Sequence, residues 1–330
     1  MHEKLYIPPY EITDEIINLV SDISEQVGIV TIRNGNASNP ELRHENRLKS
    51  IHSSLAIENN SLSLEQVTDI INGKRVLGAP NEIREVKNAY DAYNLLLTFD
   101  PFSIEDMLRA HGVLMADLTH EAGRFRAGGV GIFAGERLVH MAPPADIVPK
   151  LVNNLLYWMK TAELHILIKS CVFHYEFEFI HPFSDGNGRM GRMWQTLLLS
   201  RWKPIFAWLP VETLIHERRQ EYYDALAVSD KAASSTAFVE YMLRVIQDAL
   251  LDLSQTEQVR VQVTEQVKRL IAALGDNVLS AKELMALLKL KHRPTFNNNY
   301  LKPALKNGLI EMTVPDKPNS SRQKYRAADY

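Results

Sequence analysis

Apolar residues recur along most of the chain at the three- and four-residue spacing of amphipathic helices. A first stripe begins at Ile12 and ends at Gly28. Ser63 and Gln66 have the spacing of a capping box, and Gly73 follows as a helix stop. Further helices fit residues 82–97, 103–115, 145–162, 212–229 and 236–253. The pattern predicts a mainly α-helical protein.

One stretch before residue 254 has the pattern of a β-hairpin. Two short apolar runs, Val130–Phe133 and Leu138–Met141, flank a glycine-containing turn, and two prolines follow them. We therefore expect a helical bundle that carries a single hairpin.

The composition changes near residue 254. Residues 254–275 read as a long polar-faced connector helix. Beyond them the pattern is helix (280–290), turn, helix (294–308), strand (309–314), polar turn and strand (322–327). That order is typical of a winged helix-turn-helix. The predicted divisions are an N-terminal helical region (1–78), a core (79–253), the connector (254–275) and the winged helix (276–330).

Charge separates the tail from the rest of the chain. The chain has 37 Lys and Arg against 40 Asp and Glu, a net of −3. Residues 276–330 hold ten basic and five acidic residues, a net of +5, so the remainder is −8. The single cysteine, Cys171, cannot form an internal disulfide, the N-terminus has no apolar signal core, and the apolar stretch after Pro204 is too short to span a bilayer. We expect a cytoplasmic protein.

Residues 181–192 read HPFSDGNGRMGR, which contains the glycine spacing of a dinucleotide-binding fingerprint. Alternating aromatic residues from Phe173 to Phe179 and an acid at Glu212 favour that interpretation. Against it, five residues separate the apolar run from the glycines, and bulky polar side chains occupy the spacer positions. The run before His181 also keeps a helical stripe. We reject the dinucleotide interpretation.

The same residues suit phosphate chemistry better. A Gly-Asn-Gly turn that leads into a helix exposes backbone N–H groups as an anion site. Arg189 and Arg192 project from nearly the same helix face and suit a polyphosphate. Asp185 would repel phosphate unless a divalent cation such as Mg²⁺ bridges them. His181 is a base for an attacking hydroxyl. The residues indicate metal-assisted transfer of a phosphorus-containing group from a nucleotide.

HPFSDGNGRMGR resembles the Fic-family motif, HPFx(D/E)GNGRxxR, at every specified position. The resemblance extends over roughly residues 1–253, through SSLAIENN, NEIREVKNAYDAY, the GRFR…VGIF…HMAPP segment and EYYDAL. It implies a mainly helical fold, with a helix before His181. It also implies an enzyme, a protein adenylyltransferase that moves AMP from ATP onto a Ser, Thr or Tyr hydroxyl of a target protein and releases pyrophosphate.

The resemblance assigns roles to the residues of the motif. His181 is the implied general base and Asp185 the implied Mg²⁺ ligand. Gly186, Asn187 and Gly188 form the implied anion hole around the α-phosphate, while Arg189 and Arg192 hold the β- and γ-phosphates.

The resemblance also implies how ATP and target are docked. The hairpin resembles the Fic flap, which registers the target by strand addition; its expected docking residues are Val130, Gly131, Ile132, Val139, His140 and Met141. Tyr222 and Tyr223 are expected to border the adenine.

Residues 54–59, SLAIEN, resemble the family's inhibitory motif, (S/T)xxxE(G/N). In relatives with this motif before the core, its glutamate pairs with the second arginine of the catalytic motif, here Arg192. Glu58 would then compete with the γ-phosphate for the guanidinium, and Ser54 opens the motif. The expectation is a self-inhibited enzyme. Removal of AMP and the use of another nucleotide donor stay open as alternatives.

The winged helix offers a function of a different class. Its second helix carries Lys302 and Lys306, with His292 and Arg293 just before, and Asn297–Asn299 could reach base edges. A DNA-binding regulator is therefore the alternative outside catalysis. A protein partner at the winged helix, a homodimer and self-modification are also open.

Overall fold

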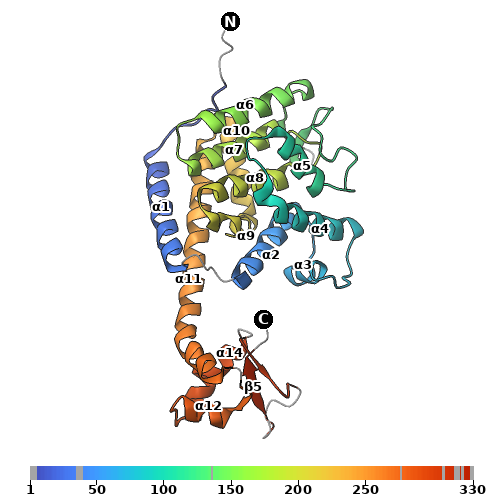
Figure 1. Ribbon diagram of the computed structural model, residues 1–330. Helices are drawn as coiled ribbons and strands as arrows, with labels where there is room; N and C mark the ends of the chain where they lie inside the picture. Colours follow the sequence, from blue (N-terminus) through green and yellow to red (C-terminus); the bar gives the residue numbers. More distant parts are fainter. Residues whose placement is uncertain are drawn as a thin grey trace. The chain divides into compact units, whose positions relative to one another are not determined.

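The structure is a computed structural model that describes residues 6–34, 40–134, 137–275, 277–306, 309–315, 320 and 323–327. The chain forms two compact units, Met1–Leu251 and Asp252–Tyr330. The predicted mainly helical class is confirmed (Figure 1). Within the described residues, no helix combines the length and apolar character needed to cross a membrane.

The first unit is built from helices joined by short loops. Its α-helices are α1 (Asp14–Asn34), α2 (Pro40–Ile57), α3 (Leu64–Ile71), α4 (Pro80–Leu95), α5 (Ile104–Leu114), α6 (Val148–Thr161), α7 (Ile166–Ile180), α8 (Asn187–Trp202), α9 (Val211–Glu217) and α10 (Arg219–Ala232). Short 3₁₀ turns are η1 (Leu96–Thr98), η2 (Ala145–Ile147) and η3 (Pro204–Ala207).

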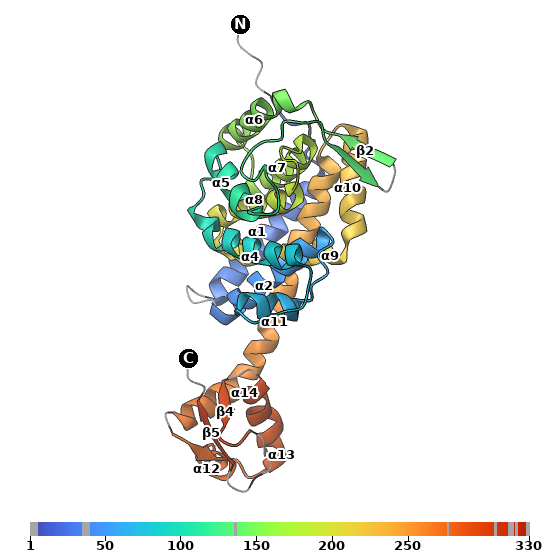
Figure 2. The same ribbon diagram turned by 90° about the vertical axis from the view of Figure 1, so that its right-hand side faces the viewer.

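Helix α7 lies at the centre of this unit, with α8 packed against it (Figure 2). Its sequence is apolar on every side, and even Ser170, His174, Glu176 and Glu178 are buried. A helix without a polar face must be covered on all sides, so the other helices surround it. The two carboxyl groups buried on α7 have consequences for pH dependence.

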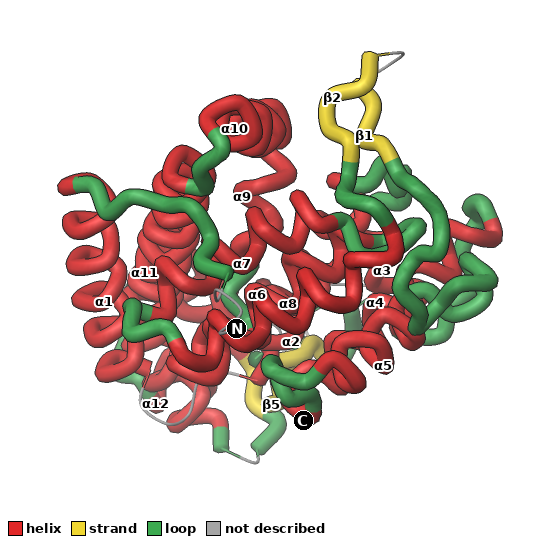
Figure 3. The backbone as a smooth tube through the Cα atoms, turned by 90° about the horizontal axis from the view of Figure 1, so that it is seen from above, coloured by secondary structure: helices red, strands yellow, loops and turns green. Residues whose placement is uncertain are grey.

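Two pairs of helices far apart in sequence are joined by polar contacts. Helix α1 lies beside α11 (Thr236–Leu274), with Thr13 bonded to Glu240 at 2.7 Å (Figure 3). Helix α2 packs on α9, where the buried Glu212 carboxylate accepts hydrogen bonds from Ser50 (2.9 Å) and Tyr93 (3.0 Å). The Glu212 contacts hold α2 and α4 against α9.

Most predicted helix boundaries agree with the structure. Ser63 and Gln66 form the expected capping box of α3, and Ser103 caps α5. Two boundaries were predicted wrongly. Helix α1 continues through Gly28 to Asn34, because a helix interior tolerates one glycine and Val30 extends the buried stripe. The helix predicted at 212–229 is broken at Arg218 into α9 and α10.

The predicted hairpin is present as β1 (Gly131–Ala134) and β2 (Arg137–Met141). The strands pair antiparallel, with Gly131 opposite Met141 and a register shift between Ile132 and Phe133. The side chains of residues 132–140 lie outside the described part, so the expected docking residues Ile132, Val139 and His140 are located by backbone register alone.

The second unit contains the predicted elements in the predicted order. They are the end of α11, α12 (Ala281–Leu287), a second helical segment made of α13 (Arg293–Phe296), the π-helical turn η4 (Asn297–Leu301) and α14 (Lys302–Lys306), and the strands β4 (Ile310–Met312) and β5 (Lys324–Ala327). A short strand that the pattern did not predict, β3 (Leu279–Ser280), adds to β5 and makes the sheet order β3-β5-β4. The core of this unit includes Leu270, Leu284, Phe296 and Ile310.

The buried carboxyl groups of α7 predict a pH effect on stability. Burial raises the pKa of Glu176 from its usual 4.5 to about 7, against the hydrogen bond from Tyr6, which lowers it. A raised folded-state pKa means that the folded protein holds this proton more tightly than the unfolded chain. The resulting stabilisation is fully present below pH 4.5 and is lost as the pH rises through 7.

We therefore expect wild type to lose up to about 3 kcal/mol relative to Glu176→Gln between pH 5 and pH 8. Denaturant unfolding of both proteins across that range measures the difference, with the exposed Glu163→Gln as control. Parallel pH profiles of wild type and Glu176→Gln would contradict the assignment.

Candidate active site

The residues of the 181–192 motif lie where α7 ends and α8 begins. His181 follows the last residue of α7 and adopts a left-handed backbone, with φ of 49°. Its Nδ1 atom lies 3.3 Å from the carbonyl oxygen of Glu178. A carbonyl oxygen can only accept, so Nδ1 carries the hydrogen, and Nε2 is the nitrogen that can take up a proton. His181 is half-buried.

The loop after His181 is held by side chains that bond to its backbone. Asn187 is buried, accepts a hydrogen bond from Phe183 N (2.9 Å) and donates to Phe183 O (2.8 Å). The Phe183 ring is fully buried. The side chain of Asn187 thus fixes the loop, which leaves only its backbone for the predicted role in the anion hole.

His111 of α5 contacts the 181–192 loop, and the sequence pattern did not single it out. Its ring stacks on Phe183, with centroids 3.7 Å apart. Gly123 N donates to Nδ1 (2.9 Å), so Nε2 carries the hydrogen and donates it to the carbonyl oxygen of Asp185 (3.0 Å). Burial lowers the pKa of His111 to about 4, so the ring is neutral at physiological pH. The sequence signal that could have identified His111 was its position on the apolar face of the α5 helix, which is buried.

Arg126, in the GRFR segment, is a second such position. It is buried, and its guanidinium donates to four backbone carbonyls, those of Ile180, His181, Gly128 and Pro143. The backbone N–H of Arg126 donates to Pro182 O at 3.0 Å. Arg126 thus ties the start of the catalytic loop to the two segments that lead into and out of the hairpin.

The N-terminus of α8 has the features of an anion site. Gly186 precedes the helix with φ of 81°, and no side chain caps the helix. The first N–H groups of an α-helix have no partners within the helix, and the helix dipole makes this end positive. A Cβ atom at Gly186 would meet Met115 Sδ at 2.7 Å, so the close packing here also requires glycine.

Asp185 lies beside this helix start with its carboxylate largely exposed, at 62%. Its Oδ1 atom accepts hydrogen bonds from Gly186 N (2.6 Å) and Arg189 Nη2 (3.1 Å). Within the described residues, no group of three or more His, Cys, Asp or Glu side chains could hold a metal ion. One exposed carboxylate beside an anion site nevertheless fits Mg²⁺, which takes one or two carboxylates and completes its shell with phosphate oxygens and water.

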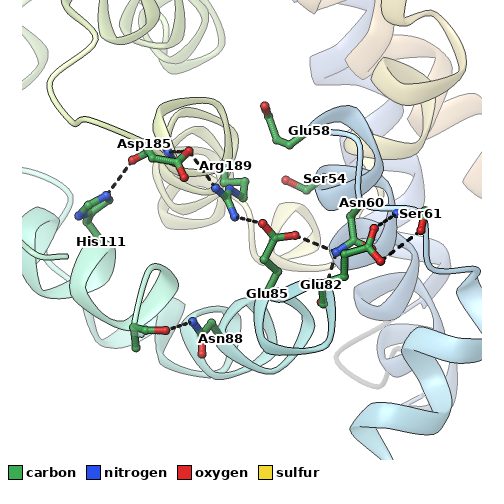
Figure 4. A network of polar contacts seen from close by, with 12 residues as sticks. Ser54, Glu58, Asn60, Ser61, Glu82, Glu85, Asn88, His111, Asp185 and Arg189 are labelled. Carbon is green, nitrogen blue, oxygen red and sulfur yellow. Dashed lines mark hydrogen bonds and ion pairs between the residues drawn. The ribbon is translucent and has the colours of Figure 1, made fainter. Parts of the chain in front are cut away.

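The two motif arginines are each paired with a carboxylate from an N-terminal helix or the turn after it. Arg189 Nη1 contacts Glu85 of α4 at 3.0 Å (Figure 4). Arg192 Nη2 contacts Glu58 at 2.7 Å, and the side chain of Arg192 is only 1% exposed. Burial lowers the pKa of Arg192, but Glu58, Tyr222 and Glu178 together outweigh it, and the net direction is upward.

Ser54 and Glu58 both contact Arg192. Arg192 Nε donates to Ser54 Oγ (3.1 Å) and Nη2 to Ser54 O (3.0 Å). The Glu58 carboxylate also lies close above α8, because a Cβ atom at Gly188 would meet Glu58 Oε1 at 2.3 Å. Asn59 adopts φ of 69° and accepts a hydrogen bond from Arg219 (2.9 Å).

The two predicted adenine-bordering tyrosines have different environments. Tyr222 is buried in the core, where its hydroxyl lies 3.2 Å from His174 Nε2. Tyr223 is 39% exposed, and the Arg219 guanidinium lies over its ring. Of the hairpin positions, Val130 is half-buried and Met141 is exposed.

Comparison with known proteins finds matches to one protein family in both units of the chain. Residues 101–199 match the Fic/DOC family, and residues 265–328 match the C-terminal domain of the filamentation induced by cAMP protein Fic-like. Protein adenylyltransferase fic-1 from Caenorhabditis elegans is 29% identical over 208 residues, 59% of this chain and 38% of that protein. Protein adenylyltransferase Fic from Aedes aegypti is 28% identical over 195 residues, 56% of this chain and 37% of that protein. The chain thus spans about two fifths of the length of these curated relatives.

Solved structures share the fold. The structure of Fic-1 from C. elegans aligns with a TM-score of 0.61 at 19% identity, over 74% of this chain and 72% of that one. The crystal structure of a Fic family protein from Desulfovibrio desulfuricans G20 aligns with a TM-score of 0.76 at 54% identity. It covers 98% of this chain and 99% of that one. Because a relative of this identity aligns along almost the full length of both chains, and because the 181–192 region matches the family directly, this chain belongs to the Fic family.

Proposed function

We propose that this chain is a protein adenylyltransferase that moves AMP from ATP to a hydroxyl side chain of a target protein. The observation that carries the proposal is the start of α8, an uncapped helix end that directly follows the loop with His181 and the exposed Asp185 carboxylate. The names of the curated relatives support the same reaction class.

In the proposed reaction His181 Nε2 takes the proton of the target hydroxyl. The hydroxyl oxygen attacks the α-phosphorus, the bond from phosphorus to the bridging oxygen breaks, and pyrophosphate leaves with the electron pair. The backbone N–H groups of Asn187 and Gly188, with that of Gly186 once it leaves Asp185 Oδ1, stabilise the charge that develops on the α-phosphate oxygens. The left-handed backbone of His181 and the Nδ1 contact with Glu178 O hold the imidazole in the required tautomer.

Asp185 is the proposed magnesium ligand. When bound, Mg²⁺ neutralises part of the phosphate charge, as it does in other phosphoryl transfers. His111 holds the Asp185 backbone, and Arg189 bonds to its carboxylate, so both residues orient the ligand. Arg192 would bind the distal phosphates, while Arg189, which is shared between Glu85 and Asp185, adds little charge of its own to the phosphate site.

We propose that Glu58 inhibits the reaction by occupying Arg192. A guanidinium bound to a carboxylate at 2.7 Å cannot present the same nitrogen to a phosphate. The anchoring of α2 through Ser50 and Glu212 keeps this pair in place. The hairpin is the proposed docking strand for the target, and the exposed Tyr223 is the better placed of the two tyrosines to contact adenine.

A second candidate function, nucleic-acid binding, rests on the helical segment 293–306. This segment contains no acidic residue. Arg293, Asn298, Asn299 and Lys302 are exposed on it, while Phe296 and Tyr300 face the core. A basic, amide-rich face of this kind suits phosphates and base edges.

The proposed reaction predicts a specific labelling pattern. With Mg²⁺ and ATP labelled on the α-phosphate, Glu58→Gly should transfer about tenfold more label to protein than wild type, because a strong charge-assisted contact is removed. Adding His181→Ala should lower transfer about 100-fold or more. ATP labelled on the γ-phosphate should give no covalent label.

The same assay distinguishes the alternatives. Equal transfer by wild type and Glu58→Gly would contradict self-inhibition. Label transferred from another nucleotide, with none from ATP, would show that ATP is not the donor. Wild type that strips AMP from labelled protein faster than Glu58→Gly would favour the reverse reaction.

Nucleic-acid binding predicts a salt effect on the full-length protein. Lys302→Ala should weaken binding to duplex DNA and reduce the slope of log affinity against log salt concentration by about one. Lys160→Ala, an exposed lysine of the first unit, is the matched control. Identical binding by both variants, or none by wild type at low salt, would exclude DNA as the partner of this face.

A further inference from the structure

Glu85 contacts Arg189 of the 181–192 motif. Glu85 itself belongs neither to that motif nor to the inhibitory motif at residues 54–59. Its Oε1 atom accepts from Arg189 Nη1 at 3.0 Å, while Arg189 Nη2 donates to Asp185 at 3.1 Å. The Arg189 side chain is 6% exposed, against 23% for Glu85 and 62% for Asp185. A nearly buried cation is therefore shared between two carboxylates, of which only Asp185 is largely in solvent.

The other oxygen of Glu85 is held by the inhibitory turn, defined here as residues 58–62. Asn60 Nδ2 donates to Glu85 Oε2 (2.8 Å) and to Glu82 O (3.2 Å), and its Oδ1 accepts from Leu62 N (3.1 Å). Asn60 is buried, so these bonds fix the orientation of its amide. Figure 4 shows the continuous row of contacts from Asn60 through Glu85 and Arg189 to Asp185.

Charge determines what this row does. Glu85, Arg189 and Asp185 together carry a formal charge of −1, which favours a cation at Asp185. Without the Glu85 charge the sum is zero, and the buried guanidinium would draw more strongly on Asp185. A carboxylate held by arginine in this way is a poorer ligand for a divalent cation.

We propose that Glu85 is a positioning residue that neutralises Arg189 and so leaves Asp185 able to bind the Mg²⁺ of MgATP, with Asn60 orienting Glu85. The inference rests on the proposed function, because it concerns the metal of that reaction. Asn60 lies two residues after Glu58, so the turn that occupies Arg192 also sets the affinity of the site for its cation.

The test uses the full chain with the brake removed, in the Glu58→Gly background. Mn²⁺ is the probe, and its binding is measured by electron paramagnetic resonance with an ATP analogue that has a methylene bridge between the α- and β-phosphates. Glu82→Gln is the matched control, because Glu82 lies on the same helix and its carboxylate bonds Ser61 of the same turn rather than Arg189.

Glu85→Gln should weaken Mn²⁺ binding about tenfold, as expected for a group that orients a metal ligand. Asn60→Ala should weaken it about fivefold, the value of one hydrogen bond. Glu82→Gln should bind like the background. Raising Mn²⁺ should restore AMP transfer by Glu85→Gln, which loss of folding would not allow.

The outcomes separate this inference from the proposed function. If Glu85→Gln binds Mn²⁺ like Glu82→Gln while the background transfers AMP, the role of Glu85 is overturned and the function stands. If the background binds Mn²⁺ and nucleotide but transfers nothing, the function fails, and the comparison of Glu85 with Glu82 still decides the inference. Absence of Mn²⁺ binding by the background would overturn both.

Discussion

A buried guanidinium must be paired, and this requirement organises the site. Arg192 lies almost wholly out of water between α7 and α2, so its charge needs a carboxylate and further hydrogen-bond acceptors. Glu58 and Ser54 supply them from a segment that is remote in sequence. Because leaving Arg192 unpaired would be costly, these contacts hold α2 and the turn after it against α8. A ligand that displaces Glu58 must therefore bring negative charge of its own, as a polyphosphate does.

The shape of the catalytic loop comes mainly from side chains that bond to backbone. Arg126, His111 and Asn187 each bond carbonyl or N–H groups of the loop through their side chains. The loop is in this way fixed before any ligand arrives, and its N–H groups need little rearrangement when charge develops on a phosphate.

The sequence predicted the parts of the site that lie close together along the chain. His181, Asp185 and the glycines were identified because twelve consecutive residues carry them, and Glu58 because its short motif resembles a known one. His111, Arg126 and Glu85 act on partners 74, 55 and 104 residues away, so no local spacing predicts these contacts, although Arg126 and Glu85 lie in segments that carry the family resemblance. The same limit applies to the fold. Capping residues marked the starts of α3 and α5, whereas tertiary packing carried α1 past Gly28 and broke the helix at Arg218.

The left-handed backbone of Asn59 bears on the strength of the proposed inhibition by Glu58. Its φ of 69° lies in a region that glycine and asparagine enter at low cost and β-branched residues avoid. This residue follows Glu58 directly, at the turn after α2. If Glu58 inhibits as proposed, the identity of residue 59 would tune catalytic output through backbone preference alone, without any contact with the nucleotide. The glycine-or-asparagine rule at the end of the inhibitory motif is, on this account, a rule about chain geometry.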